Sequence, residues 1–336
     1  MKTVDTKPDI SVIVAVGRDD IGSCLGSLLG QTLPRDRYEV ILVSDRPVEF
    51  EPGENVVTVT EESADPATKR NSGARESRGG ILAFIDDDAW ARDDWLENGL
   101  AFLARHPGAA GVGGPRLLPA NASFRQKATD IIAHSAFFGN GHGNWREMQV
   151  RNKVPHGMIN SCNYFIRRDI FLELGGYNEA IGYGGEDTEF IYRAVTEGGC
   201  LFAYTWDLIV YHPPRRIGWG LMKQRFRYRV QNGKMLWIHP GLYLSRWTFS
   251  IGLFGITAFV IASIFKPIVF PVGLGLYVLC ASLFSLPYVR YDWRFILVLP
   301  PAFFIHHVIY YLAIWKGILY GLFYRSSIRE IKDFRK

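Results

Sequence analysis

The sequence predicts an α/β domain with a mostly parallel, Rossmann-like sheet, followed by a helical membrane domain. Up to about residue 212, short apolar runs alternate with helical patterns, which is typical of βαβ units. Acidic residues then almost disappear, and Asp292 is the only one between residues 249 and 323. With 336 residues, the chain has room for one large domain and a second element.

The predicted strands of the first half are apolar runs at residues 10–16, 38–45, 55–60, 81–85 and 109–114. Helical spacing covers about residues 20–29, 66–75 and 93–106, and Asp65-Pro66 has the composition of an N-cap and first turn. A further strand and a short helix are expected in "NYFIRRDIFLELGGY". Because parallel strands end at one edge of a sheet, we expect Val16, Asp45 and Asp86 to lie along that edge.

An acidic triplet, Asp86-Asp87-Asp88, directly follows the apolar run at residues 81–85. Three carboxylates at a strand end repel one another unless a cation lies among them. Hard oxygen ligands suit Mg²⁺ or Mn²⁺, which usually take one or two carboxylates and complete their shell with phosphates. A solvated turn that caps the next helix is the alternative interpretation.

Other features of the first half narrow the class of protein. The polar start "MKTVDTKPD" lacks the pattern of a signal peptide, so the first domain is expected to stay in the cytoplasm. The four cysteines are scattered without paired spacing and indicate a reduced compartment, not a zinc site or a disulfide framework. The loop "GRDDIGS" lacks the Gly-rich dinucleotide fingerprint, which disfavours a redox domain. Lys69 and Arg70 would neutralise a diphosphate or form a solvated helix face.

The ordered motifs "SVIVAV", "ILVSD", "ADPATKRNSGARESRGGILAFIDDDAW" and "LGGYNEAIGYGGEDTEFIYRA" resemble family 2 inverting glycosyltransferases with the GT-A fold, over about residues 10–212. The resemblance implies that Asp45 meets the nucleotide base and Arg70 the diphosphate. It also implies a D-x-D pair, with Asp86 near the ribose and the metal and Asp88 on the metal. The remaining expected donor contacts are Val14, Ala15, Val16, Arg18 and Asp87. Many relatives carry Pro, Tyr or Asn where this chain has Val16-Gly17-Arg18, so the nucleotide stays open.

Glu186 and Asp187 begin a helix after a glycine-rich turn. Carboxylates in a first turn complement the helix dipole, so a structural role is one interpretation. Sugar transfer to a hydroxyl also needs a general base, and Asp187 resembles the family's base, with Glu186 near the acceptor. A phosphate acceptor gains little from a base, so Asp187 favours a sugar hydroxyl. Tyr183 is a candidate sugar platform.

Two more polar residues are candidates for the site. His212 closes a predicted strand where relatives place a histidine that completes metal coordination, although a lone histidine is often structural. Asn163 is a candidate contact of the acceptor or donor sugar.

Residues 213–234 are rich in Lys and Arg, contain no acid and are interleaved with aromatic residues. This composition predicts a basic amphipathic helix on an anionic membrane, and the apolar segments that follow make nucleic acid an improbable partner. Within it, "QRFRY" resembles the Q-x-x-R-W motif of polysaccharide synthases. By that resemblance Gln224 and Arg227 hold the donor diphosphate and Tyr228 stacks on the acceptor. Tyrosine in place of tryptophan favours addition of one sugar per encounter.

Three apolar segments follow, at residues 249–265, 268–289 and 295–323. The first is barely long enough to span a bilayer and the third exceeds one span. We expect about three transmembrane helices, although a basic tail and a catalytic domain on the same face require an even number. One segment would then be re-entrant or interfacial. The expected divisions are 1–212 catalytic, 213–247 interfacial, 248–324 transmembrane and 325–336 basic tail.

Together these features predict a multi-pass enzyme of the cell membrane whose catalytic domain faces the cytoplasm. It would use Mg²⁺ or Mn²⁺ to move a sugar from a nucleotide-sugar, UDP-linked by expectation, to a hydroxyl of a lipid-linked or growing glycan. A polyprenyl-phosphate glycosyltransferase and a processive synthase are the enzymatic alternatives. A catalytically silent subunit that binds glycan is the rival from another class. The donor sugar, the acceptor and the oligomeric state stay open.

Overall fold

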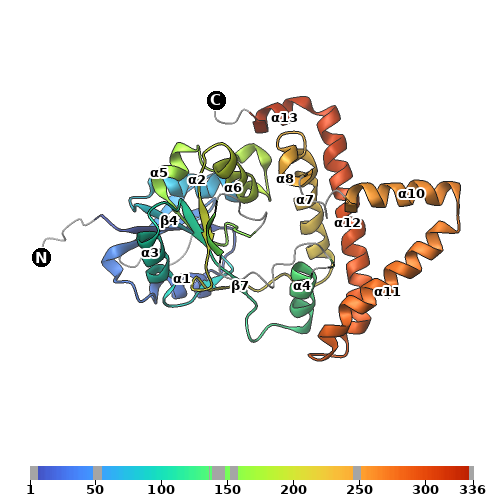
Figure 1. The fold of residues 1–336 in the computed structure, drawn as a ribbon. Coiled ribbons are helices and arrows are strands. Elements are labelled where there is room, and N and C mark those ends of the chain that lie inside the picture. The colour runs from blue at the N-terminus through green and yellow to red at the C-terminus, as the bar shows by residue number, and fades with distance from the viewer. Residues whose placement is uncertain are drawn as a thin grey trace, which may run out of the picture. The chain divides into compact units, whose positions relative to one another are not determined.

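The computed structural model describes residues 7–47, 55–135, 137, 148–151, 158–244 and 251–332. The chain folds into two compact units (Figure 1). Unit 1 contains residues 1–120, 146–213 and 334–336, and unit 2 contains residues 121–145 and 214–333. Residues 121–145, within the range 1–212 that we expected to form the catalytic domain, therefore belong to unit 2. The assignment of functions to the four ranges stays a prediction.

The core of unit 1 is an eight-stranded sheet with the order β3-β2-β1-β4-β9-β6-β10-β8. Strands β3, β2, β1 and β4 are parallel, whereas β9 runs antiparallel to both β4 and β6. The bounds are β1 Ile10–Val16, β2 Tyr38–Ser44, β3 Val56–Thr60, β4 Ile81–Asp86, β6 Gly111–Gly113, β8 Met148–Arg151, β9 Asn163–Arg167 and β10 Phe202–Tyr204. The predicted α/β class with a mostly parallel sheet is confirmed.

A small second sheet joins β5, Trp90–Ala91, to β11, Val210–Tyr211, and β11 to β7, Arg116–Leu117. This pairing brings the segment just before His212 next to the segment just after the acidic triplet. Two residues distant in sequence, His212 and Asp88, are thereby placed at one edge.

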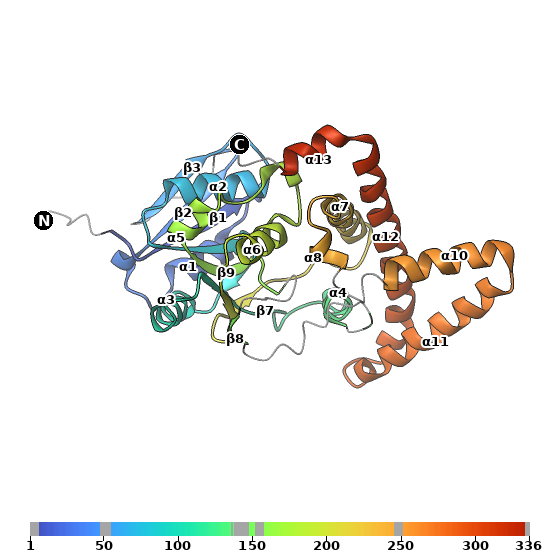
Figure 2. The same cartoon turned by 45° about the horizontal axis from the view of Figure 1, so that its top comes forward.

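Helices cover both faces of the large sheet (Figure 2). Buried side chains of α1, Gly22–Leu29, and α3, Trp95–Arg105, pack with Val12 and Val14 of β1. Those of α2, Pro66–Glu76, α5, Arg168–Glu173, and α6, Glu186–Thr196, pack with Ile13 on the other face. This alternation follows the two-residue period of a strand. Short 3₁₀ turns lie at Arg35–Arg37 and Glu179–Ile181.

Helix α2 lies very close to the sheet. A Cβ added at Gly73 would stand 2.7 Å from Ile13 Cγ2, so only glycine permits this approach. The close packing buries the polar side chains of Lys69, Arg70 and Asn71. The polar face of α2 is therefore internal, and the alternative of a solvated helix face is wrong.

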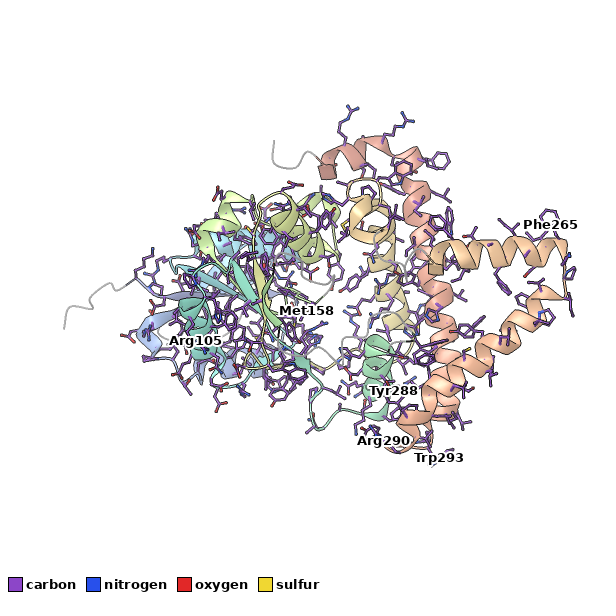
Figure 3. The ribbon with its side chains drawn as sticks, viewed as in Figure 1. Arg105, Met158, Phe265, Tyr288, Arg290 and Trp293 are labelled. Carbon is purple, nitrogen blue, oxygen red and sulfur yellow. The ribbon has the colours of Figure 1, made fainter. Side chains whose placement is uncertain are left out.

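Unit 2 is helical. Its elements are α4 Phe124–His134, α7 Trp219–Met235, α8 Pro240–Leu244, a π-helical turn Ile251–Gly255, α10 Ile256–Phe265, α11 Val269–Val289, α12 Phe295–Phe323 and α13 Arg325–Lys332. Among the described residues, α11 and α12 are long and apolar enough to cross a membrane, and the apolar helix Gly252–Phe265 is shorter. In Figure 3, Phe265 marks the end of α10 before α11, Tyr288 lies near the end of α11, and Arg290 and Trp293 mark the turn between α11 and α12.

Candidate active site

The carboxyl edge of β1, β2 and β4 gathers the predicted acidic residues. Ala15 pairs with Asp86 and Val16 with Ser44, so the loop after β1 lies between the ends of its two neighbours. The backbone N–H groups of Gly17 and Arg18 both donate to Asp87 Oδ2, at 2.7 and 3.0 Å. Asp87 therefore fixes the loop after β1, and its charge is engaged inside the protein.

A group of side chains that could bind a cation lies directly beside this loop. His212 Nε2 is 3.0 Å from Asp88 Oδ1, and the Arg18 guanidinium forms an ion pair with Asp88. Ligand atoms of Asp86, His212 and Cys162 lie within 4.8 Å of one another. The predicted residues Asp86, Asp88 and His212 thus come together, joined by a cysteine that the sequence analysis did not single out.

The donor set fits a hard divalent cation. Asp86 and Asp88 provide carboxylate oxygens and His212 a ring nitrogen, all partly exposed. Burial raises the pKa of the Cys162 thiol well above its usual value, with Asp86 adding to the effect. A hard divalent cation prefers the carboxylate oxygens and the imidazole nitrogen to a thiol, so Asp86, Asp88 and His212 are the favoured ligands.

Arg70 connects this edge to the beginning of α6. It is 5% exposed, and its Nη2 donates to Asp86 Oδ1 at 2.8 Å while its Nη1 donates to Glu186 Oε1 at 3.0 Å. Arg70 Nε and Glu186 Oε2 are buried and have no hydrogen-bond partner among the described residues. The guanidinium thus bridges two predicted site carboxylates.

Glu186 and Asp187 differ in their surroundings although they are adjacent. Burial raises the pKa of Glu186 to about 7, the Asp187 charge adds to the shift and Arg70 opposes it. Asp187 is partly exposed, with Oδ1 accepting from Thr188 N at 2.6 Å and Oδ2 from Ser161 N at 3.2 Å. Gly182, Gly184 and Gly185 precede them with φ of 75°, 103° and 104°. Only glycine adopts these positive φ angles without strain, and the turn that the glycines form precedes a partly exposed Asp187.

Lys69 fixes the position predicted to meet the nucleotide base. Its buried Nζ donates to Val16 O at 2.7 Å and to Asp45 Oδ1 at 2.5 Å. The hydrogen bond from Lys69 lowers the pKa of Asp45, which keeps this carboxyl ionised. Lys69 therefore acts on the first loop and on Asp45, and its ammonium is occupied by them.

Asn71 is a polar residue whose importance the sequence analysis missed. Its Nδ2 donates to Tyr177 O at 2.8 Å and to Glu179 Oε1 at 2.7 Å, and its Oδ1 accepts from Tyr177 N at 2.9 Å. These bonds tie α2 to the segment that leads into Gly182 and α6. The signal in the sequence was the uninterrupted polar run "KRNS" in a helix packed on a sheet.

Two predicted contacts are corrected by the structure. Asn163 is 1% exposed, and its amide makes hydrogen bonds of 2.8, 2.7 and 2.8 Å with Pro115 O, Leu208 O and Trp95 Nε1. It is a core residue, because every polar atom of its side chain is used internally. Val14 is fully buried in β1 between β2 and β4 and also belongs to the core.

The remaining predicted residues lie on other elements. Ala15 and Val16 end β1, and Tyr183 lies in the glycine turn before α6. Gln224, Arg227 and Tyr228 lie on α7 in unit 2, where Gln224 Nε2 donates to Tyr228 Oη at 3.1 Å. Their assignment to donor or acceptor stays a prediction.

The fold has a solved counterpart. The mannosyltransferase PcManGT from Pyrobaculum calidifontis, in complex with GDP-Man and Mn²⁺, superposes with a TM-score of 0.58 at 18% identity, over 94% of this chain and 88% of that one. At 18% identity this likeness shows the fold, and it confirms the predicted GT-A fold.

Sequence comparison finds a family match over part of the chain. Residues 11–175, just under half of the chain, match the model "Glycosyl transferase family 2". Glycosyltransferase AglE of Haloferax volcanii is 27% identical over 76% of this chain and 82% of its own length. Glucosyl-dolichyl phosphate glucuronosyltransferase of the same organism is 27% identical over 52% of this chain, which spans about half (53%) of that relative.

Proposed function

We propose that the protein is a membrane-attached, metal-dependent inverting glycosyltransferase. It moves a sugar from a nucleotide-sugar to a hydroxyl of a lipid-linked or growing glycan at the cytoplasmic face of the cell membrane. Two similar proteins support the substrate classes: one is solved with GDP-Man and Mn²⁺, and the other is named for a glucosyl-dolichyl phosphate acceptor. The two long apolar helices of unit 2 support the membrane attachment.

The observation that carries the proposal is the bridge made by Arg70. One guanidinium contacts Asp86, in the predicted metal set, and Glu186, next to the predicted base Asp187. The group that meets the leaving diphosphate and the group that meets the acceptor are therefore neighbours. An in-line displacement needs both on opposite sides of one anomeric carbon.

Asp86, Asp88 and His212 would hold Mg²⁺ or Mn²⁺. A bound divalent cation would stabilise the charge that develops on the leaving diphosphate. Arg18, which pairs with Asp88, and Lys69, which holds Asp45, offset part of the negative charge of this edge.

Asp187 would remove the proton of the attacking hydroxyl. As the bond from the acceptor oxygen to the anomeric carbon forms, the bond from that carbon to the diphosphate breaks, and the hydroxyl proton passes to the Asp187 carboxylate. The diphosphate leaves with the electron pair. A single displacement inverts the anomeric centre, so an α-linked donor gives a β-linked product.

Replacing Asp187 with asparagine tests the proposal. Asp187→Asn retains the shape and removes the base, so transfer to a sugar hydroxyl should fall by roughly 10²–10⁴-fold while nucleotide-sugar affinity is unchanged. Release of nucleoside diphosphate, measured with native lipid extract and a panel of sugar nucleotides, is the assay. Asp169→Asn, an exposed acid at the start of α5, is the matched control.

Near wild-type transfer by Asp187→Asn would overturn the hydroxyl acceptor. It would instead favour a polyprenyl phosphate acceptor, whose oxygen is already an anion and needs no base. The same assay addresses processivity, because Tyr228 in place of tryptophan predicts one sugar per encounter. Long polymer from the wild type would contradict that part alone.

A further inference from the structure

Helix α12 has a buried face and an exposed face along its whole length, and both are largely apolar. Its buried residues follow helical spacing: Phe295, Leu299, Pro300, Ala302, Phe303, His306, Ala313, Ile314, Gly317 and Gly321. Exposed apolar residues recur on the opposite face: Leu297, Phe304, Ile305, Val308, Leu312, Leu319 and Leu322. Both faces extend from one end of the 29-residue helix to the other.

Helix α4 covers the N-terminal half of the buried face. The rings of Phe124 and Phe295 stack at 4.8 Å, and the Arg294 guanidinium lies 4.3 Å from the centre of the Phe124 ring. Ala128 and Ile132 of α4 are buried in one cluster with Leu299, Ala302 and Phe303. The start of α12 is thereby fixed to α4.

Helix α7 covers the C-terminal half of the same face. A Cβ at Gly317 would stand 2.1 Å from Val230 O, so the two helix backbones nearly touch. Trp237 Nε1, just after α7, donates to Ile318 O at 3.0 Å, and Lys234 Nζ lies 4.1 Å from the centre of the Tyr320 ring. The end of α12 is thereby fixed to α7.

Both covering helices belong on the water side of a membrane. The chain enters α4 from unit 1 and returns to unit 1 after it, so both neighbours of α4 are in the catalytic unit. Helix α7 carries the basic residues Lys223, Arg225, Arg227, Arg229 and Lys234, which are costly in hydrocarbon. Phe295 and Gly321 are about 39 Å apart along a helix, more than the roughly 30 Å hydrocarbon core. If α12 crossed the bilayer, α4 and α7 would lie on opposite faces of it.

We therefore propose that α12 lies along the membrane surface, with its exposed apolar face against lipid acyl chains, and that only the α10–α11 hairpin enters the bilayer. The proposal rests on the membrane attachment proposed above. Basic residues lie at both ends of α12, Arg290 and Arg294 before it and Arg325 and Arg329 after it. They place both ends on the same, cytoplasmic face, where anionic head groups attract them.

The hairpin has the form of an insertion that returns to its own side. Thr257 Oγ1 lies 3.2 Å from Tyr311 Oη, and Tyr277 Oη lies 2.7 Å from His307 Nδ1, so both legs meet α12 one helical turn apart. At the turn between the legs, Ile264, Phe265 and Ile268 are 72%, 80% and 69% exposed. Figure 3 shows Phe265 at the end of the hairpin away from α12. Because the hairpin enters the bilayer and returns to the same side, the basic tail and the catalytic domain remain on one face. The even number of crossings that this requires is therefore met without α12.

Thiol labelling in sealed vesicles tests this arrangement. In a chain carrying Cys200→Ala and Cys280→Ala, single cysteines are introduced as Trp293→Cys before α12 and Ser326→Cys after it, with Tyr291→Cys as a second site before α12. Arg105→Cys, at the end of α3, marks the catalytic side and is labelled in Figure 3. A membrane-impermeant maleimide should modify the positions on both sides of α12 to the same extent as Arg105→Cys, without permeabilisation. Phe265→Cys should not react from that side.

The possible failures are distinct. If Arg105→Cys and Ser326→Cys react and both Trp293→Cys and Tyr291→Cys need permeabilisation, α12 crosses the bilayer and the proposal is overturned, while membrane attachment stands. Reaction of Phe265→Cys from the catalytic side would show that the hairpin is not inserted. If the unmodified chain fails to sediment with vesicles of anionic and neutral lipid, the membrane attachment itself is wrong.

Discussion

Both units of this protein have an apolar core, but they differ in the other residues that they bury or expose. Unit 1 buries charged side chains, among them Lys69, Arg70 and Glu186, and forms ion pairs with them inside the unit. Unit 2 exposes large apolar side chains, among them Ile264 and Phe265. A buried charge without a partner is strongly unfavourable, and so is an exposed apolar surface of this extent in water.

The difference indicates two different solvents and two different tasks. In unit 1 the buried charges converge on one sheet edge, where they hold each other in fixed orientations. In unit 2 the apolar residues face outward because their partners are lipids in our proposal. A polar substitution at an apolar position should therefore reduce stability in unit 1, whereas on the exposed face of unit 2 it should reduce membrane binding.

The largest expected effect is on activity and comes from the metal set. Asp88→Ala removes a carboxylate that pairs with His212 and Arg18. Loss of the Lewis acid is worth several kcal/mol of transition-state stabilisation, so transfer supported by Mg²⁺ or Mn²⁺ should be abolished. Nucleoside diphosphate release measures it, with the exposed Asp36→Ala as control. Undiminished wild-type turnover in excess chelator would remove the metal from the proposal.

Arg70→Met should have the largest effect on stability. It leaves Glu186 buried without its cation, and breaking a buried pair from one side typically costs about 3–5 kcal/mol. Denaturant unfolding measures the change. Adding Glu186→Gln to Arg70→Met should recover part of the loss, since no buried charge then lacks a partner. A single variant that loses less than about 1 kcal/mol would mean that the bridge is not a structural centre of unit 1.

The pH dependence of stability should report Glu186. Its pKa is raised from 4.5 to about 7, so the folded protein binds this proton more tightly than the unfolded chain. The contribution of Glu186 to stability is therefore greatest below the unfolded value, falls as pH rises toward 7 and is absent above it. The loss is up to about 3 kcal/mol at 1.36 kcal/mol per pKa unit. Glu186→Gln should remove this slope, and a slope that persists unchanged in that variant would assign it to another group.

The smallest expected effect is that of a polar substitution on unit 2. Ile264→Ser should change stability in detergent by no more than about 0.5 kcal/mol, because Ile264 is 72% exposed. The matched substitution Ile85→Ser, at a fully buried strand position, should cost about 2–5 kcal/mol. In vesicle sedimentation the two variants should rank the other way. Ile264→Ser should bind vesicles roughly tenfold more weakly than the wild type, whereas folded Ile85→Ser should bind them as well as the wild type. Equal losses of stability would show that the two units share one solvent.

Local patterns in the sequence predicted the elements of unit 1 and the acidic edge. The apolar runs ending at Val16 and at the triplet are β1 and β4, and the ends of β1, β2 and β4 place Val16, Asp45 and Asp86 along one edge, as expected. Long-range pairing was beyond the same reasoning. The antiparallel β9 enters between β4 and β6, and β11 brings His212 to Asp88, through contacts that no local period encodes.

Side-chain environments were the hardest to predict. Asn163 is of a residue type that often contacts ligands, yet its side-chain amide donates hydrogen bonds to backbone carbonyls in the core. Lys69 and Arg70 belong to a helix of polar composition. Their side chains are buried because Gly73 lets α2 pack closely against the sheet. Helical spacing shows that a helix has an apolar face but not which partner covers it. For that reason the membership of α4 in unit 2 was missed.

The place of α4 in the chain has a consequence for synthesis. Its apolar residues Phe124, Ala128 and Ile132 pack with Phe295 and Phe303, which are made about 170 residues later. At about 5–20 residues per second, roughly ten to thirty seconds separate the emergence of α4 from that of its partner. During this interval unit 1 is complete in sequence up to residue 213, while α4 waits with an uncovered face. A ribosome that stalls before α12 would leave a nascent chain whose exposed α4 is a target for chaperones.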